Sequence, residues 1–175
     1  LKFKISHKIT DDNSSNFTIK PLDRGYGITV GNSLRRALLT AVPGAAITNV
    51  KIDGAHHEFS TIDGVKEDVA DIIMNLKGVR FHLFESKVEP IFLKVKGPKA
   101  FTAADIQAVS DDFTILNSNH HITDVAKGTT LEVELRLGIG KGYKSSEENK
   151  LNNSPVGMIP ICLLYTSDAA DERSW

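Results

Sequence analysis

Cysteine is nearly absent from this sequence, which contains one thiol, Cys162. One cysteine cannot close an intramolecular disulfide, so the sequence excludes a disulfide-rich secreted scaffold and favours a reducing compartment. No apolar run approaches the ~20 residues that span a bilayer. The first residues also lack the apolar core of a secretory signal. We therefore expect a soluble cytoplasmic protein that makes no membrane contact.

An excess of either charge is missing as well. Lys and Arg total 21 against 22 Asp and Glu, which gives a formal net charge of -1. This balance excludes a protein that grips nucleic acid over its whole surface, although a local basic patch stays open. The 175 residues are enough to bury a core without metals or disulfides. We expect one domain or two small interleaved ones.

Period-two alternation of apolar and polar residues indicates strands along most of the chain. Phe3, Ile5 and Ile9 predict a first strand, and Phe17 and Ile19 predict a second that pairs back on it. Because most strand segments follow one another without a helix between them, the predicted class is α+β with mainly antiparallel sheets and two principal helices. The further strand signals lie around Ile47–Ile52 and Phe59 and at 79–84, 91–96 and 130–137.

The first principal helix is predicted over residues 32–42, with apolar residues on more than one side. Asn32 is a suitable N-cap, and Pro43 followed by Gly44 should end the helix. One apolar stripe has the spacing of a single helix face, and Leu39 lies off it. The stripe consists of Leu34, Leu38, Ala41 and Val42.

Two interpretations of this helix stay open. It is either a core helix on which Arg35 and Arg36 are solvated, or a helix that faces a partner. Adjacent arginines beside apolar residues suit an interface, because arginine combines a packable stem with a bidentate fork.

The second principal helix is predicted over residues 65–77, where the apolar residues form one stripe. Glu67 and Asp68 are expected in its first turn, where they favour the positive end of the helix dipole. Gly78 is expected at the C′ position. A short helical turn is predicted at 103–106.

No convergent catalytic or metal-binding set is visible. The histidines at 56–57 and 120–121 are adjacent, and neighbours on a strand point to opposite faces, so we interpret them as surface or hydrogen-bonded side chains. The aspartate pairs at 11–12 and 111–112 fit turns. Residues 138–143 lack the spacing of a phosphate-binding loop, and we expect a flexible basic loop there. The sequence thus predicts no catalytic residue, no metal site and no cofactor.

One long run resembles a known family. Residues 21–39 read PLDRGYGITVGNSLRRALL, a run similar to the signature of the bacterial RNA polymerase alpha subunit. The resemblance continues in order and covers roughly residues 1–161. Its other motifs are IDG at 52–54, HEFSTI at 57–62, GVKEDV at 64–69, NLKG at 75–78, AADI at 103–106 and GKGY at 140–143.

The resemblance implies a dimerisation subdomain with a second subdomain inserted into it. The first would be residues 1–43 together with about 156–161, in an incomplete form, and the inserted one would be residues 44–155. The final segment, 162–175, matches nothing in the family, and we interpret it as a foreign tail. The resemblance also implies that DNA contact belongs to a C-terminal domain absent from this chain.

The family further implies a homodimer that recruits the beta and beta-prime subunits, in which the catalytic residues and magnesium belong to beta-prime. The chain would then be a non-catalytic assembly subunit of a nucleotidyltransferase, from the bacterial cytoplasm or, alternatively, a plastid stroma. The residues that the resemblance places at the dimer and large-subunit interface are Gly31, Asn32, Leu34, Arg35, Arg36, Leu38, Leu39 and Lys77.

Two other hypotheses remain. The chain could be a free-standing protein-binding module of the same fold, or an independent enzyme. The enzyme hypothesis would require a cleft with titratable residues around His57 or His120.

Overall fold

The computed structural model describes residues 3–11, 14–84, 89–151 and 155–165. The chain divides into two compact units, Leu1–Leu38 and Leu39–Trp175. Every strand pairing within the described residues is antiparallel, which confirms the predicted α+β class. Among the described helices, none combines the length and apolar character that a membrane crossing requires.

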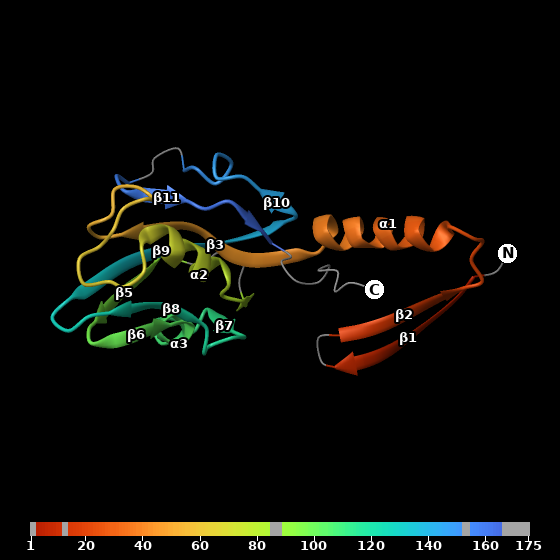
Figure 1. Ribbon diagram of the computed structural model, residues 1–175, viewed down its shortest axis with the longest axis horizontal. Coiled ribbons are helices and arrows are strands. Elements are labelled where there is room, and N and C mark those ends of the chain that lie inside the picture. The colour runs from red at the N-terminus through yellow and green to blue at the C-terminus, as the bar shows by residue number, and fades with distance from the viewer. Residues whose placement is uncertain (1–2, 12–13, 85–88, 152–154, 166–175) are drawn as a thin grey trace. The chain divides into compact units, whose positions relative to one another are not determined.

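The first unit contains a hairpin and a helix (Figure 1). Strands β1 (Lys4–Asp11) and β2 (Ser14–Lys20) pair with Ile5 opposite Ile19 and His7 opposite Phe17, which confirms both predicted strands. Asp11 ends β1, and its predicted turn partner Asp12 lies outside the described residues.

Helix α1 spans Tyr26–Ala41, so the prediction that it begins after Asn32 was wrong. The chain reverses at Gly25, whose φ of +89° suits glycine, and the Tyr26 amide donates to the Asp23 carbonyl at 3.1 Å. The helix therefore starts directly after this turn. A glycine in a helix interior lowers helix stability by about 1 kcal/mol relative to alanine. Gly27 and Gly31 therefore led the sequence pattern to predict a later start. The predicted end before Pro43 is confirmed.

The second unit is built on a four-stranded sheet in the order β11-β3-β9-β5. Its strands are β3 (Pro43–Ile52), β5 (Ile91–Lys96), β9 (Thr130–Lys141) and β11 (Met158–Pro160). Alternation sets the faces: β5 buries Ile91, Leu93 and Val95 and exposes the residues between them. The predicted strands at 47–52, 91–96 and 130–137 are thus confirmed.

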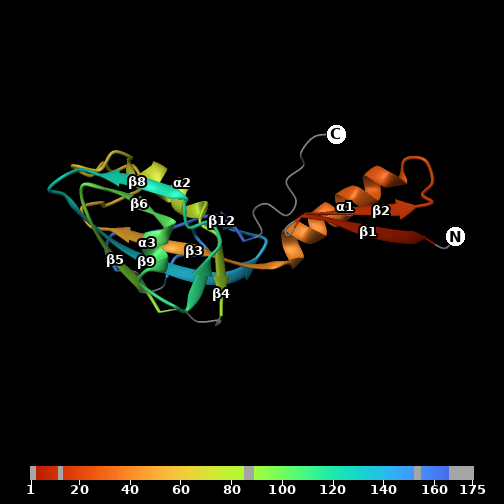
Figure 2. The ribbon, with the colours of Figure 1, turned by 90° about the horizontal axis from the view of Figure 1, so that it is seen from below.

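Smaller elements pack around one core with this sheet (Figures 1 and 2). Helix α2 has its buried residues, Val69, Ile72, Ile73 and Leu76, in this core. The short helix predicted at 103–106 is confirmed as α3. These smaller elements are α2 (Val69–Lys77), β4 (Phe81–Leu83), β6 (Lys99–Thr102), α3 (Ala103–Gln107), β7 (Phe113–Ile115), β8 (His121–Val125), β10 (Tyr143–Lys144) and β12 (Leu163–Leu164).

Helix α2 begins at Val69, so the prediction of a helix from residue 65 was wrong. Asp68 is the N-cap, and its carboxylate accepts from the Asp71 amide at 2.8 Å. The residues before it are not helical: Val65 bridges to Val125, and the Lys66 amide donates to the Asp124 carbonyl at 3.0 Å. Because the backbone of this segment bonds to β8 and not within a helix, α2 begins only at Val69.

Two further predictions were wrong. Phe59 lies in a turn and is 79% exposed, so no strand forms there. Residues 138–141 continue β9 instead of forming a flexible loop, because they pair with β3. A Cβ on Gly140 would lie 2.2 Å from a ring carbon of Tyr165. The absence of a side chain at Gly140 therefore lets the Tyr165 ring pack directly against β9.

Residues 162–165, where the foreign tail was predicted to begin, pack on the second unit. Strand β12 pairs with β10, and the amide of Tyr165 donates to the Gly142 carbonyl at 3.1 Å. The rest of the predicted tail, 166–175, lies outside the described residues. The origin of the whole segment stays a prediction.

Candidate functional site

The hairpin of the first unit has one apolar and one polar face. Directly opposed residues of an antiparallel pair project to the same side, so His7 and Phe17 share a face with the pair Ile5 and Ile19. Their rings stack with centroids 5.8 Å apart. Phe17 is 67% exposed. The other face carries the polar residues Lys4, Ser6, Lys8, Asn16, Thr18 and Lys20.

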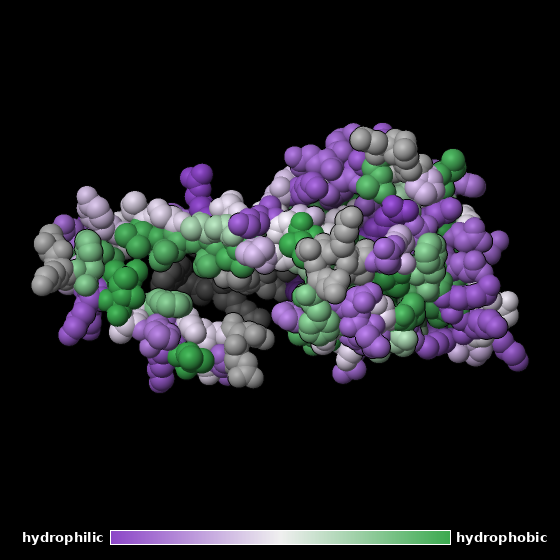
Figure 3. Space-filling view, turned by 180° about the vertical axis from the view of Figure 1, so that it is seen from behind, coloured by the Kyte–Doolittle hydropathy of each residue, from purple (hydrophilic) through white to green (hydrophobic). Residues whose placement is uncertain are grey.

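Helix α1 buries none of its residues. Leu34 and Leu38 lie on one side of the helix and are 49% and 42% exposed. Ile28 is 75% exposed and lies on a different side, in line with Leu39 along the helix axis. The core-helix interpretation therefore fails within the described residues. Figure 3 shows hydrophobic residues gathered along the surface of the first unit.

The predicted interface residues fall into two groups. Those from Gly31 to Leu39 all lie on α1. Lys77 lies in the last turn of α2 in the second unit, where it is half-buried and its Nζ donates to Cys162 Sγ at 3.4 Å. A hollow of about 320 Å³ adjoins it, lined by Ala46, Ile47, Lys77, Tyr143, Cys162, Leu163 and Leu164.

The outer face of the sheet carries paired charges. Lys94 forms an ion pair with Glu132, and Arg136 lies 3.0 Å from Glu134. Phe92 stands among them, 67% exposed, beside a hollow of about 340 Å³. Because these charges neutralise one another, this face offers no single ligand chemistry.

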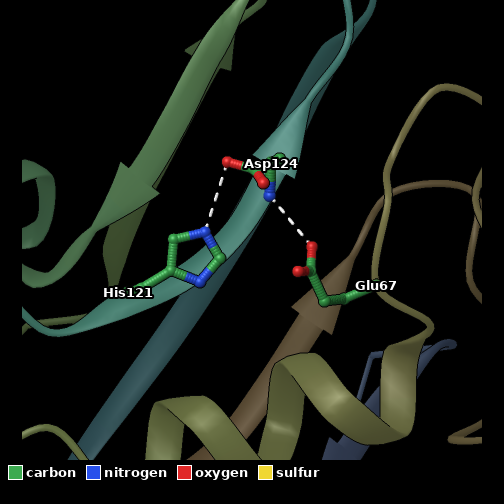
Figure 4. A group of neighbouring side chains, drawn as sticks. All are labelled: Glu67, His121 and Asp124. Atoms are coloured by element: carbon green, nitrogen blue, oxygen red, sulfur yellow. Dashed lines mark hydrogen bonds and ion pairs between the residues drawn. The ribbon is translucent and has the colours of Figure 1, made fainter.

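An ionic group ties the segment before α2 to strand β8. Glu67 Oε2 accepts from Thr123 Oγ1 at 2.7 Å and from the Asp124 amide at 3.0 Å. Asp124 in turn bonds to Lys66 at 3.1 Å and to Nε2 of His121 at 3.2 Å. Figure 4 shows the two carboxylates and the imidazole converging.

Hydrogen bonds within this ionic group lower the pKa values of both Glu67 and Asp124. Partial burial raises the pKa of Glu67, but the hydrogen bonds from Thr123 and the Asp124 amide outweigh it and lower the pKa overall. Hydrogen bonds from His121 and Lys66 lower the pKa of Asp124.

The ligand atoms of Glu67, His121 and Asp124 lie within 4.8 Å of one another, a spacing that a divalent cation could use. Here they bond to one another, to β8 and to the Lys66 ammonium, so ion pairing already accounts for the group. Local spacing could not reveal it, because Glu67 is distant in sequence from its partners.

Replacing Glu67 by Gln should remove an acid-sensitive contribution to stability. The lowered pKa means that the carboxylate stabilises the fold fully above its ordinary value of 4.5 and loses this effect as pH falls through the lowered value. The difference in unfolding free energy between wild type and E67Q should therefore shrink from about pH 7 to about pH 3 in urea titrations. E58Q, in an exposed turn, is the control, and a pH-independent difference would contradict the prediction.

Three of the histidines form hydrogen bonds within the fold. His57 Nδ1 accepts from the Phe59 amide at 3.2 Å in an exposed turn, and Nε2 of His120 lies 2.8 Å from the Asn75 carbonyl. The Asp112 carboxylate accepts from the Ser110 hydroxyl at 2.8 Å in a bend, a local bond between side chains. The interpretation of hydrogen-bonded histidines is confirmed for His57, His120 and His121.

Residues 50–166 match the family described as the RNA polymerase Rpb3/RpoA insert domain. Three relatives bear the name DNA-directed RNA polymerase subunit alpha. That of Chloroherpeton thalassium is 47% identical over 86% of this chain and 46% of the relative. That of Salinibacter ruber is 48% identical over 89% of this chain and 47% of the relative. That of Limosilactobacillus reuteri is 47% identical over 91% of this chain and 52% of the relative. The chain spans about half the length of these relatives.

Proposed function

This chain belongs to the family of bacterial RNA polymerase alpha subunits, and we propose that it serves as a non-catalytic assembly subunit of DNA-directed RNA polymerase. In this proposal, two copies dimerise through the first unit, and the dimer recruits the beta and beta-prime subunits. The complete enzyme is a nucleotidyltransferase, to which this chain contributes position and no chemistry.

The observation that carries the proposal is the uncovered apolar surface of the first unit. The described residues of α1 leave large apolar side chains on two sides of the helix, and the hairpin presents a further apolar face. A group of large exposed apolar side chains is a usual mark of a surface that a partner covers. A symmetric pair of copies could cover the side of Leu34 and Leu38, because a twofold interface uses one self-complementary patch.

The other side of α1 suits the large subunit. Ile28 and Leu39 share this side with Arg35, and Arg36 lies at its margin. Arginines beside apolar residues are enriched at protein interfaces. We place Lys77 at a second contact with the large subunits, and we retain residues 1–43 with about 156–161 as the dimerisation subdomain and 44–155 as the inserted one.

The non-catalytic role is supported by how the titratable groups are used. In the described part of the chain, the converging carboxylates and histidine are bonded to one another and to Lys66. The alternative of a free-standing binding module has no observation in its favour, since the three relatives bear the name of a polymerase subunit.

Replacing Arg36 by Ala should weaken assembly with the large subunits. Truncation of an interface arginine commonly lowers affinity by about tenfold to a hundredfold. The measurement is the dissociation constant between the intact alpha subunit carrying this sequence and the purified large subunits. R24A, which removes an arginine outside α1, is the control; an R36A variant that assembles like wild type would contradict the interface role.

A further inference from the structure

We propose that the turn at 117–120 is a positioning element for Lys77, because its side chains hold the carbonyl groups at the C-terminal end of α2. The inference rests on the proposed function, in which Lys77 contacts a large subunit. It adds two positioning residues, Asn117 and His120, that touch no partner themselves.

The last carbonyls of a helix lack the usual partner four residues further on, so groups at and beyond the helix end bond to them. The Asn75 carbonyl accepts from the Gly78 amide at 3.0 Å, and His120 adds a second contact to the same oxygen. Here Nε2 of His120 lies 2.8 Å from the Asn75 carbonyl oxygen, and Nδ2 of Asn117 donates to the Gly78 carbonyl at 2.9 Å. Both donors come from one turn, closed by a 2.9 Å bond from the His120 amide to the Asn117 carbonyl.

The chemistry of each contact fixes the donor. A carbonyl oxygen only accepts, so Nε2 of His120 carries the proton. The amide of Asn117 is used at both ends, since its Oδ1 accepts from the Arg80 backbone amide at 2.8 Å. The Arg80 guanidinium adds long contacts of 3.4 Å to the carbonyls of Lys77 and Gly78. The side chains of Asn117 and His120 therefore fix the backbone on both sides of Lys77.

Gly78 shows how closely the helix end and the turn fit. It is the C-cap residue of α2, with an ordinary right-handed φ of -74°, so the prediction that it lies at C′ was wrong by one position. A Cβ at this position would lie 2.6 Å from Nε2 of His120. A side chain at this position would push the His120 ring away from its contact with the helix end.

The residues that precede Lys77 in the helix are also fixed. The side chain of Asn75 donates to the Ile122 carbonyl of β8 at 2.8 Å, and Leu76 is buried in the core. With both the backbone and the flanking residues held, the Cα–Cβ direction of Lys77 is set. The Lys77 ammonium here donates to Cys162 Sγ at 3.4 Å, so binding a large subunit would exchange this contact and reset only the side-chain torsions of Lys77. A backbone that is already held lowers the entropic cost of that contact.

The test compares His120→Leu with His120→Gln in the intact alpha subunit carrying this sequence. Leucine cannot donate, whereas the glutamine amide nitrogen stands as many bonds from Cβ as Nε2 does and can replace it. We expect H120L to weaken binding to the large subunits about tenfold, and H120Q to bind within about twofold of wild type. The matched control is H121L, because the adjacent His121 bonds to Asp124 and not to α2.

A double-mutant cycle with Lys77→Ala separates positioning from general destabilisation. If His120 acts through Lys77, H120L should cause no further loss of affinity in the K77A background. Equal losses in both backgrounds, or wild-type binding by H120L, would overturn the inference while a weakened K77A still supports the proposed function. A K77A variant that binds like wild type would overturn the inference together with the contact at Lys77.

A second readout does not depend on assembly. Hydrogen exchange at the C-terminal amides of α2 should be about tenfold faster in H120L and unchanged in H120Q, since local opening sets this rate. If the unmodified subunit forms no complex with the large subunits, the proposed function fails. Unchanged exchange in H120L would then also overturn the positioning role.

Discussion

Replacing Leu34 and Leu38 together by glutamate should abolish the proposed self-association of the intact alpha subunit and leave a monomer. Both side chains are exposed on the same side of α1 and four residues apart, so they would be buried together in a symmetric pair. Burial of a leucine contributes about 1.5–3 kcal/mol, and each copy contributes two leucines. We therefore expect the self-association constant to fall by more than about a hundredfold.

The measurement is the molar mass of the intact subunit by light scattering across a range of concentrations. The matched control is Thr29→Glu with Ser33→Glu, which places two glutamates at the same spacing on the polar side of the same helix. It should leave the dimer intact. A dimeric L34E/L38E variant, or a control that dissociates equally, would refute the assignment of this side of α1 to the dimer.

Replacing Phe101 by Ala should destabilise the second unit severely. Phe101 lies on β6 opposite Thr123 and is 0% exposed, within the core shared by the sheet and α2. Deletion of a buried phenylalanine side chain costs about 3–5 kcal/mol, through lost burial and the cavity that remains. That cost is a large part of the 5–15 kcal/mol of stability that is typical of a domain.

Urea denaturation of the chain, followed by circular dichroism, measures this effect as a lower midpoint. The control is Phe92→Ala, which deletes the same side chain from the outer face of β5, where it is 67% exposed. F92A should change the unfolding free energy by no more than about 0.5 kcal/mol, as is usual for surface substitutions. Comparable losses in the two variants would contradict the core described here.

Local pattern predicted much of the fold. The alternation at 91–96 gave strand β5 with its observed bounds, because a half-buried strand must alternate and β5 does. The non-helical segment before α2 was not predicted, because its partners lie far away in the sequence. Residues 65–68 have helical spacing in the sequence, but β8 supplies hydrogen bonds to their backbone and to the Glu67 carboxylate.

The candidate site divides in the same way. The order of residues on α1, including Arg35 and Arg36, follows from the sequence because helical geometry alone decides which residues share a side. The groups that hold Lys77 could not be predicted. Asn117 and His120 are distant from it in sequence, and only the packing of the β7–β8 turn against α2 brings them together.

The sequence by itself determined the family, the α+β class and the apolar character of α1, because these depend on residue order and local periodicity. The tertiary structure alone decided where α2 begins, which side chains lie against Gly78 and Gly140, and which donors hold the end of α2. Each of these depends on contacts between segments far apart in the chain, whose geometry local periodicity does not encode. The two apolar sides of α1 depend on both: residue order places the apolar side chains on these sides, and the structure shows that none of them is buried.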